Sequence, residues 1–101
     1  MGLFGWLGGN DNSAVKEMLE KGAVIIDVRS PEEFKSGHVQ GSRNIPLQKI
    51  DQKVDELKKI GKPLVLCCAS GGRSGRATQL LKSKGIPCEN GGGWRQVDAM
   101  V

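Results

Sequence analysis

One stretch, from Leu64 to Arg76, constrains the fold more than any other part of the chain. It opens with four apolar residues, Leu64 to Cys67, which is the pattern of a short strand buried on both faces. Cys68 and a glycine-rich loop follow at once, and apolar residues at helical spacing begin at Ala77. A strand that passes through a tight loop into a helix is typical of a parallel α/β sheet. The stretch therefore predicts that class of fold and places a thiol at the end of a strand.

Cys68 has the sequence surroundings of a reactive thiol. The pattern Cys-x-x-Gly-x-Arg, from Cys68 to Arg73, lets the loop turn its backbone N–H groups inward as an anion cradle. The partial positive charge of the following helix N-terminus and the full charge of Arg73 favour the thiolate and attract anions. The alternative is a tight turn with an ordinary buried cysteine. A cysteine without this pattern would be interpreted as an ordinary buried residue, whereas the whole pattern at the end of a strand favours a nucleophile.

The rest of the chain alternates helices with strands. Helices are predicted from the polar break at 10–13 to Gly22, from Ser30 to about Gly37, over 50–60, from the glycine-rich loop to Gly85, and over 94–101. Strands are predicted over 23–28, 43–45, 64–67 and 86–89, with a flexible turn at 90–93. This order predicts a small parallel sheet of four or five strands with helices on both faces. Ligands of such sheets bind beyond the carboxyl ends of the strands, where Cys68 stands.

Composition predicts one soluble domain and limits its partners. The 101 residues leave room for a domain over 13–101 behind an apolar, glycine-rich tail over 1–12, in which Phe4 and Trp6 are expected to be flexible or to cover the domain. A weak membrane or partner contact of this tail is the alternative. No apolar run is long enough for stable membrane insertion. The net charge of +4 comes from basic residues mixed with acidic ones, and aromatic residues make up 4%, so nucleic acid is not an expected partner.

The three cysteines predict reduced thiols and a cytoplasmic protein. Cys67 and Cys68 are adjacent, which would strain a disulfide between them, and no pair of cysteines has the spacing of metal ligands. Cys88 lies in a predicted strand and is expected to pack as a small apolar side chain.

Two long motifs occur in order within this short chain. The first runs from Asp27 to Pro46 and begins Asp-Val-Arg-Ser-Pro-Glu-Glu. The second is the loop from Cys68 to Ser74, followed by Gly92-Gly93-Trp94. Together they resemble the rhodanese family of sulfurtransferases over about residues 13 to 100. The departure from the family lies at the N-terminus, where residues 1–12 replace a short strand, so an edge strand is expected to be missing or irregular.

The resemblance implies a single-domain rhodanese in which Cys68 carries sulfur as a persulfide. It implies a substrate-binding loop formed by Ala69, Ser70, Gly71, Gly72, Arg73 and Ser74. The residues alone support the same chemistry, because a soft thiolate can attack the outer sulfur of thiosulfate while the loop holds the departing sulfite. Cyanide, a small thiol or a protein acceptor would then remove the sulfur. The expected partners are a small sulfur-containing anion such as thiosulfate and a thiol or protein acceptor, and no metal or organic cofactor is needed.

Other polar residues of the motifs are expected to have structural roles. Asp27 and Arg29 resemble the family's Asp-x-Arg and are predicted to bond nearby loops and Glu33. His38 is predicted to be a hydrogen-bonded loop histidine, because a thiolate already favoured by its loop needs no base. Arg76 lies one helical turn beyond the loop, where it either adds charge at the mouth or is solvated.

Two other functions fit parts of the pattern. Counting from Cys67 gives Cys-x5-Arg, the longer loop of cysteine-based phosphatases and arsenate reductases of related fold, whereas counting from Cys68 gives Cys-x4-Arg. Cys67 lacks the His that precedes the phosphatase cysteine and continues the apolar strand, so it is predicted to be buried and inert. The third possibility is a non-catalytic binding module of rhodanese fold. The presence of both the cysteine and the basic loop residue argues against it.

Overall fold

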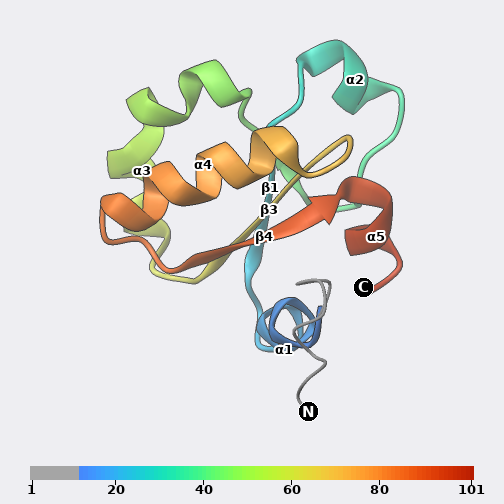
Figure 1. The fold of residues 1–101 in the computed structure, drawn as a ribbon, viewed down its shortest axis with the longest axis horizontal. Coiled ribbons are helices and arrows are strands. Elements are labelled where there is room, and N and C mark those ends of the chain that lie inside the picture. Colours follow the sequence, from blue (N-terminus) through green and yellow to red (C-terminus); the bar gives the residue numbers. More distant parts are fainter. Residues whose placement is uncertain (1–11) are drawn as a thin grey trace.

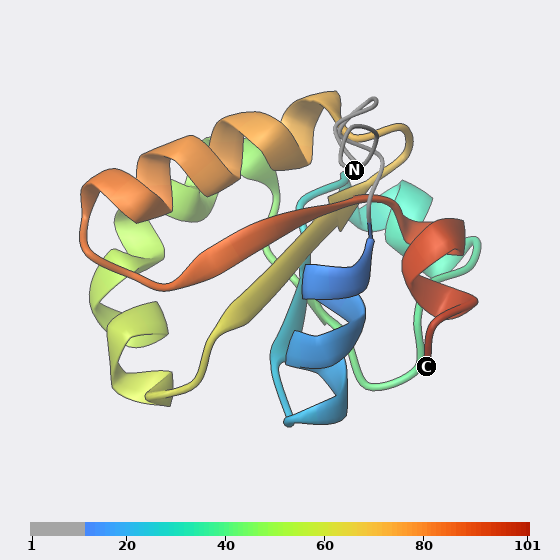
Figure 2. The same ribbon diagram turned by 60° about the horizontal axis from the view of Figure 1, so that its bottom comes forward.

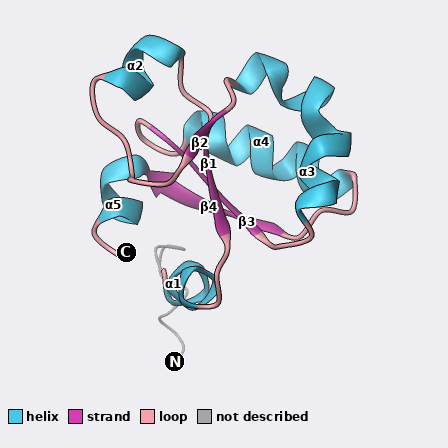
Figure 3. Ribbon diagram, turned by 180° about the vertical axis from the view of Figure 1, so that it is seen from behind, coloured by secondary structure: helices cyan, strands magenta, loops and turns pink. Residues whose placement is uncertain are grey.

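The sheet has the strand order β2 (Arg43–Asn44), β1 (Val24–Asp27), β3 (Leu64–Cys68) and β4 (Cys88–Gly93), and all of its neighbouring strands run parallel (Figures 1 and 3). The structure is a computed structural model and describes residues 12–101. Four strands lie in this range, which agrees with the predicted α/β class and parallel sheet. The irregular edge strand expected over 1–12, and the tail residues Phe4 and Trp6, fall outside the described residues except for Asn12.

Apart from those of β4, the element boundaries lie close to those predicted. The strands are β1 (Val24–Asp27), β2 (Arg43–Asn44), β3 (Leu64–Cys68) and β4 (Cys88–Gly93). The helices are α1 (Ser13–Glu20), α2 (Pro31–Lys35), α3 (Val54–Ile60), α4 (Gly72–Ser83) and α5 (Trp94–Asp98), and a 3-10 helix, η2 (Leu47–Lys53), precedes α3. The helix predicted over 50–60 is therefore a 3-10 helix in its first part. None of the helices within 12–101 is long and apolar enough to cross a membrane.

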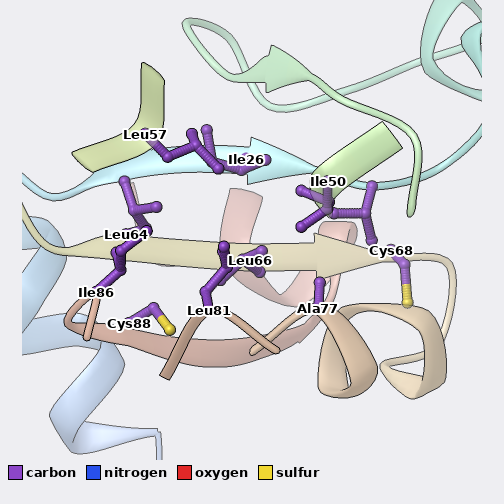
Figure 4. Close-up of a cluster of buried hydrophobic side chains, with 11 residues drawn as sticks. Ile26, Ile50, Leu57, Leu64, Leu66, Cys68, Ala77, Leu81, Ile86 and Cys88 are labelled. Atoms are coloured by element: carbon purple, nitrogen blue, oxygen red, sulfur yellow. The ribbon is translucent and has the colours of Figure 1, made fainter. Parts of the chain in front are cut away.

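Helices cover both faces of the sheet, as predicted (Figures 2 and 3). Successive side chains of β3 point to opposite faces, so Leu64, Leu66 and Cys68 pack toward α3 and α4. Val65 and Cys67 pack on the other face, against residues of α1 and α5. Each fully buried Leu or Val contributes about 1.5–3 kcal/mol to folding. The burial of β3 on both faces explains its uninterrupted apolar sequence and fixes the position of its last residue, Cys68 (Figure 4).

The end of β4 contradicts one prediction. The prediction of a flexible turn at 90–93 was wrong, because these residues continue β4. They pair with β3, with Gly92 opposite Cys67 and Gly93 opposite Cys68. A bulge interrupts this pairing after Leu66, and Gly92 in it has a φ of 85°, which a residue with a Cβ adopts only at a cost. The glycines weaken the strand locally, but pairing with the central strand outweighs that weakness.

Candidate active site

Cys68 lies at the carboxyl end of β3, where a short loop leads into α4. The thiol is almost fully buried, with 1% of the residue exposed. In Figure 4 its sulfur points away from the strand, toward the loop and the first turn of α4. The side chain therefore occupies the edge of the sheet at which parallel α/β proteins bind ligands.

Three groups of the loop and helix approach the sulfur atom of Cys68. The backbone N–H of Gly71 donates to Sγ at 3.0 Å, and the backbone N–H of Ser74 donates at 3.4 Å. The hydroxyl oxygen of Ser74 lies 3.3 Å from the same sulfur. Gly71 turns its N–H inward by adopting a φ of 109°, a conformation that favours glycine. The loop thus forms a cradle of neutral hydrogen-bond donors around one sulfur atom.

These donors make Cys68 the most acidic of the three thiols. Burial raises its pKa, but the hydrogen bonds from the side chain and backbone of Ser74, and from the backbone of Gly71 and Ser70, lower it further, and the pKa falls below its usual value of 9.0. Burial raises the pKa of Cys67 to about 12, with a further contribution from the charge of Asp27. Burial also raises the pKa of Cys88. Cys68 is therefore the thiol that most readily forms a thiolate.

The two adjacent cysteines have opposite environments because they lie on opposite faces of β3. Cys67 is fully buried and packs with Val65 and Val97, beneath α5. Cys68 packs toward α4 and meets the loop. All three cysteines of the chain are free thiols. The prediction that Cys67 is buried agrees with this arrangement, as does the expectation that Cys88 packs in the core, where it is 4% exposed.

Asn90, on β4, holds the cradle together and was missed by the sequence analysis. Its Oδ1 accepts hydrogen bonds from the backbone N–H of Gly92 at 2.9 Å and from the hydroxyl of Ser74 at 2.7 Å. Its Nδ2 donates to the carbonyl of Gly71 at 3.1 Å. The side chain thus joins the bulge of β4, the loop and the first turn of α4. The signal in the sequence was the position of Asn90 directly after the strand predicted over 86–89. Because a flexible turn was predicted there, Asn90 was not considered as a site residue.

Arg73 lies in α4 directly after the loop, but its guanidinium is already paired. It donates to Oε1 of Glu33 at 2.7 Å and to Oε2 at 3.0 Å, and both side chains are a little more than one third exposed. The hydrogen bond from Arg73 lowers the pKa of Glu33 to about 2, so this carboxylate stays charged at neutral pH. The sequence predicts that Arg73 helps the loop to bind an anion, and its ion pair with Glu33 was not predicted.

Asp27 and Arg29 form a buried ion pair that braces the motif around α2. Nη2 of Arg29 lies 2.7 Å from Oδ2 of Asp27, and the two residues are 4% and 0% exposed. Arg29 also donates to the backbone carbonyls of Glu33 and Gly37. Its guanidinium lies 5.0 Å from the ring centroid of Trp94. These bonds agree with the predicted structural role.

The remaining candidates are exposed at the surface. His38 is exposed, and its Nδ1 lies 2.7 Å from the carbonyl oxygen of Phe34, on whose ring it stacks. It is therefore a hydrogen-bonded loop histidine, as predicted. Ala69, Ser70, Gly72 and Arg76 are exposed. An open, polar hollow of about 260 Å³ flanks the loop, lined by Asn12, Ser70, Gly71, Asn90, Gly91, Gly92 and Gln96.

The sequence matches a known protein family over most of its length. The family model of the rhodanese-like domain matches residues 11–99. The chain belongs to the rhodanese-like domain family. The resemblance inferred from the two motifs is thereby confirmed.

Curated relatives and solved rhodanese-like structures support this assignment. The uncharacterised protein YqhL of Bacillus subtilis is 48% identical over 63 residues, which cover 62% of this chain and 49% of that protein, so the chain matches about half the length of this relative. The thiosulfate sulfurtransferase PspE of Escherichia coli is 34% identical over 74 residues, covering 71% of each chain. The human single-domain sulfurtransferase TSTD1 superimposes with a TM-score of 0.67 at 30% identity, over 83% of this chain and 88% of that one.

Proposed function

We propose that this protein is a sulfurtransferase that moves a sulfane sulfur from thiosulfate or a persulfide donor to cyanide, a thiol or a protein acceptor. Cys68 is the proposed nucleophile, and the loop from Ala69 to Ser74 is the proposed binding site. The cradle around Sγ of Cys68, formed by two backbone N–H donors and the nearby Ser74 hydroxyl, is the observation that carries the proposal. Membership of the rhodanese-like family and the similarity to the thiosulfate sulfurtransferase PspE support it.

The first half-reaction follows from a thiolate held in this cradle. The thiolate of Cys68 attacks the outer sulfur of thiosulfate, a new S–S bond forms, and the S–S bond of thiosulfate breaks. The electron pair of the broken bond leaves with sulfite. The negative charge then lies on the outer sulfur of the persulfide, next to the N–H groups of the loop, which stabilise an anion without themselves being charged.

The second half-reaction returns the thiolate. Cyanide or an acceptor thiolate attacks the outer sulfur of the persulfide, and the electron pair of the S–S bond returns to Sγ of Cys68. The donors from Gly71 and Ser74 stabilise the restored thiolate, so it is a good leaving group. This chemistry needs neither an external base nor a resident cofactor.

Two features weigh against the alternatives. A phosphatase or arsenate reductase would use Cys67 within the longer loop, yet this thiol is fully buried on the opposite face of β3 and has a pKa of about 12. A non-catalytic binding module would need no acidic thiol, yet the pKa of Cys68 is lowered by four hydrogen bonds.

Free thiols in all three positions fit a reducing compartment, and we propose a cytoplasmic location on that ground.

The intact mass of the protein tests the proposal. Incubation with thiosulfate should add the mass of one sulfur atom, and a following incubation with cyanide should remove it. Cys68→Ser should gain no sulfur. A wild-type protein that gains no mass from thiosulfate or from a persulfide donor, while folded, would contradict the proposed function.

A further inference from the structure

We infer that Glu33 is a specificity-determining residue that cancels the charge of Arg73 and thereby favours sulfur donors carrying one negative charge over dianionic thiosulfate. This inference rests on the proposed function and adds the donor class. Its basis is the pairing of the one charged residue of the loop motif with a carboxylate from a different element, α2.

The carboxylate of Glu33 is fixed before any substrate arrives. Its Oε1 accepts hydrogen bonds from the backbone N–H of Ser30 at 3.0 Å and from the Ser30 hydroxyl at 3.2 Å, as part of the capping box of α2. Nη1 of Arg29 also donates to the backbone carbonyl of Glu33 at 3.2 Å. Glu33 therefore presents both carboxylate oxygens to Arg73 from a rigid position, and the pair does not depend on two freely moving side chains.

The pair removes net positive charge from the rim of the cradle. Arg73 lies close enough to Cys68 for the charges of the two groups to interact, but the adjacent carboxylate offsets its field. The groups that contact Sγ, two backbone N–H donors and the Ser74 hydroxyl, are neutral. A dianion approaching the Cys68 thiolate thus meets like-charge repulsion with little compensation.

A donor with one negative charge suits these surroundings better. Persulfides of small thiols or of protein cysteines belong to this class. The Cys68 thiolate attacks the outer sulfur of such a donor, the S–S bond of the donor breaks, and its electron pair leaves on the donor's thiolate, so one persulfide and one thiolate are exchanged.

Glu33→Gln tests the inference with little structural disturbance. Gln can replace Glu in a capping box, and its side-chain oxygen can still accept one hydrogen bond from Arg73. The neighbouring Glu32→Gln removes one exposed carboxylate from the same helix and is the matched control. Each variant is loaded in single-turnover experiments with thiosulfate or with an aryl thiosulfonate, a monoanion that donates its outer sulfur and releases sulfinate. Sulfur gain is followed by intact mass.

The expected result is a change in donor preference. Glu33→Gln should raise the rate ratio of thiosulfate to thiosulfonate by about three- to tenfold, the effect of about 1 kcal/mol of charge interaction. Glu32→Gln should leave the ratio within about twofold, because screening weakens a solvated charge. The gain should shrink at high ionic strength.

The contrary results are distinct. A Glu33→Gln variant that slows both donors equally, or slows thiosulfate more, would show that Glu33 orients Arg73 for substrate and would overturn the inference. Equal effects of Glu32→Gln and Glu33→Gln would overturn it as well. A wild-type protein that takes sulfur from neither donor would overturn the proposed function itself.

Discussion

The hydroxyl of Ser74 donates its proton to Oδ1 of Asn90 at 2.7 Å, although the sulfur of Cys68 lies only 3.3 Å from the same oxygen. The direction of this bond is fixed, because Oδ1 also accepts from the backbone N–H of Gly92 and an amide oxygen cannot donate. A hydroxyl has one proton, so Asn90, the carbonyl oxygen of Gly71 at 3.3 Å and the Cys68 thiolate compete for it. We therefore predict that Asn90 influences the acidity of Cys68 through Ser74.

Two substitutions should shift the pKa of Cys68 in opposite directions. Ser74→Ala removes a donor to the thiolate and should raise the pKa, whereas Asn90→Ala frees the Ser74 proton for the sulfur and should lower it. One hydrogen bond corresponds to about half to one pKa unit. The rate of alkylation by iodoacetamide against pH measures both shifts.

The double variant is the control for this competition. If Asn90 acts through Ser74, then Asn90→Ala should have no effect on the pKa of Cys68 once Ser74 is Ala. Shifts in the same direction for both single variants would instead mean that Asn90 only holds the loop in place.

Replacing each cysteine separately should identify the nucleophile. Cys68→Ser should abolish sulfur transfer, because the hydroxyl remains protonated where the thiol ionises. Cys67→Ala should keep sulfur transfer and lower stability by about 1–2 kcal/mol, since it leaves a small cavity in the core. Turnover and urea denaturation measure the two effects. Loss of turnover in a folded Cys67→Ala, with turnover kept in Cys68→Ser, would reverse the assignment.

The sequence was sufficient to predict the strand that carries Cys68 and the separation of the two cysteines. Both follow from local patterns, namely an uninterrupted apolar run and the period of two along a strand. The extension of β4 and the pairing of Glu33 with Arg73 could not be predicted in the same way. Each depends on residues brought together by the sheet topology, and 40 positions separate Glu33 from Arg73 along the chain. The glycines of β4 disfavour a strand locally, but their pairing with β3 holds them in one.

The pH dependence of stability should differ in sign between the two adjacent cysteines. The pKa of Cys68 is lower in the folded protein, so its contribution is complete above the unfolded value of 9.0 and is lost as the pH falls through the folded pKa. The pKa of Cys67 is raised to about 12, so its contribution is complete below 9.0 and is lost as the pH rises toward 12.

Urea denaturation of wild type and Cys68→Ser at pH 6 and pH 9.5 measures the first of these contributions. The stability difference should move in favour of wild type at the higher pH. A difference that does not change with pH would mean that the cradle does not favour the thiolate.

Removing the charge of Asp27 should destabilise the fold without removing any contact of the Cys68 thiol. Asp27→Asn leaves the buried guanidinium of Arg29 without a countercharge, which costs about 3–5 kcal/mol in comparable buried pairs. Glu17→Gln, which breaks the exposed ion pair with Lys21, is the matched control and should leave the denaturation midpoint nearly unchanged. Similar midpoints for the two variants would contradict the structural role given to Asp27.

The size of the loop should decide which anion the cradle accepts. The loop from Cys68 to Arg73 curves around Sγ of Cys68 as a ring and places the N–H of Gly71 3.0 Å from it. This ring therefore fits closely around one sulfur atom. A tetrahedral oxyanion such as phosphate needs a wider ring, and wild type should not hydrolyse an aryl phosphate. Inserting one Gly between Gly71 and Gly72 widens the ring at a modest entropic cost, moves the N–H of Gly71 away from Sγ, and should abolish sulfur transfer.

Binding of phosphate to the insertion variant, with weak activity on an aryl phosphate, is the gain that the longer ring should bring. Ser70→Gly is a suitable control, because it also adds flexibility to the loop but keeps the ring at its natural size. Its sulfur transfer should be retained at least in part. If wild type hydrolyses an aryl phosphate readily and the insertion removes that activity, then the longer loop from Cys67 is the functional one, and the sulfurtransferase proposal gives way to the phosphatase alternative.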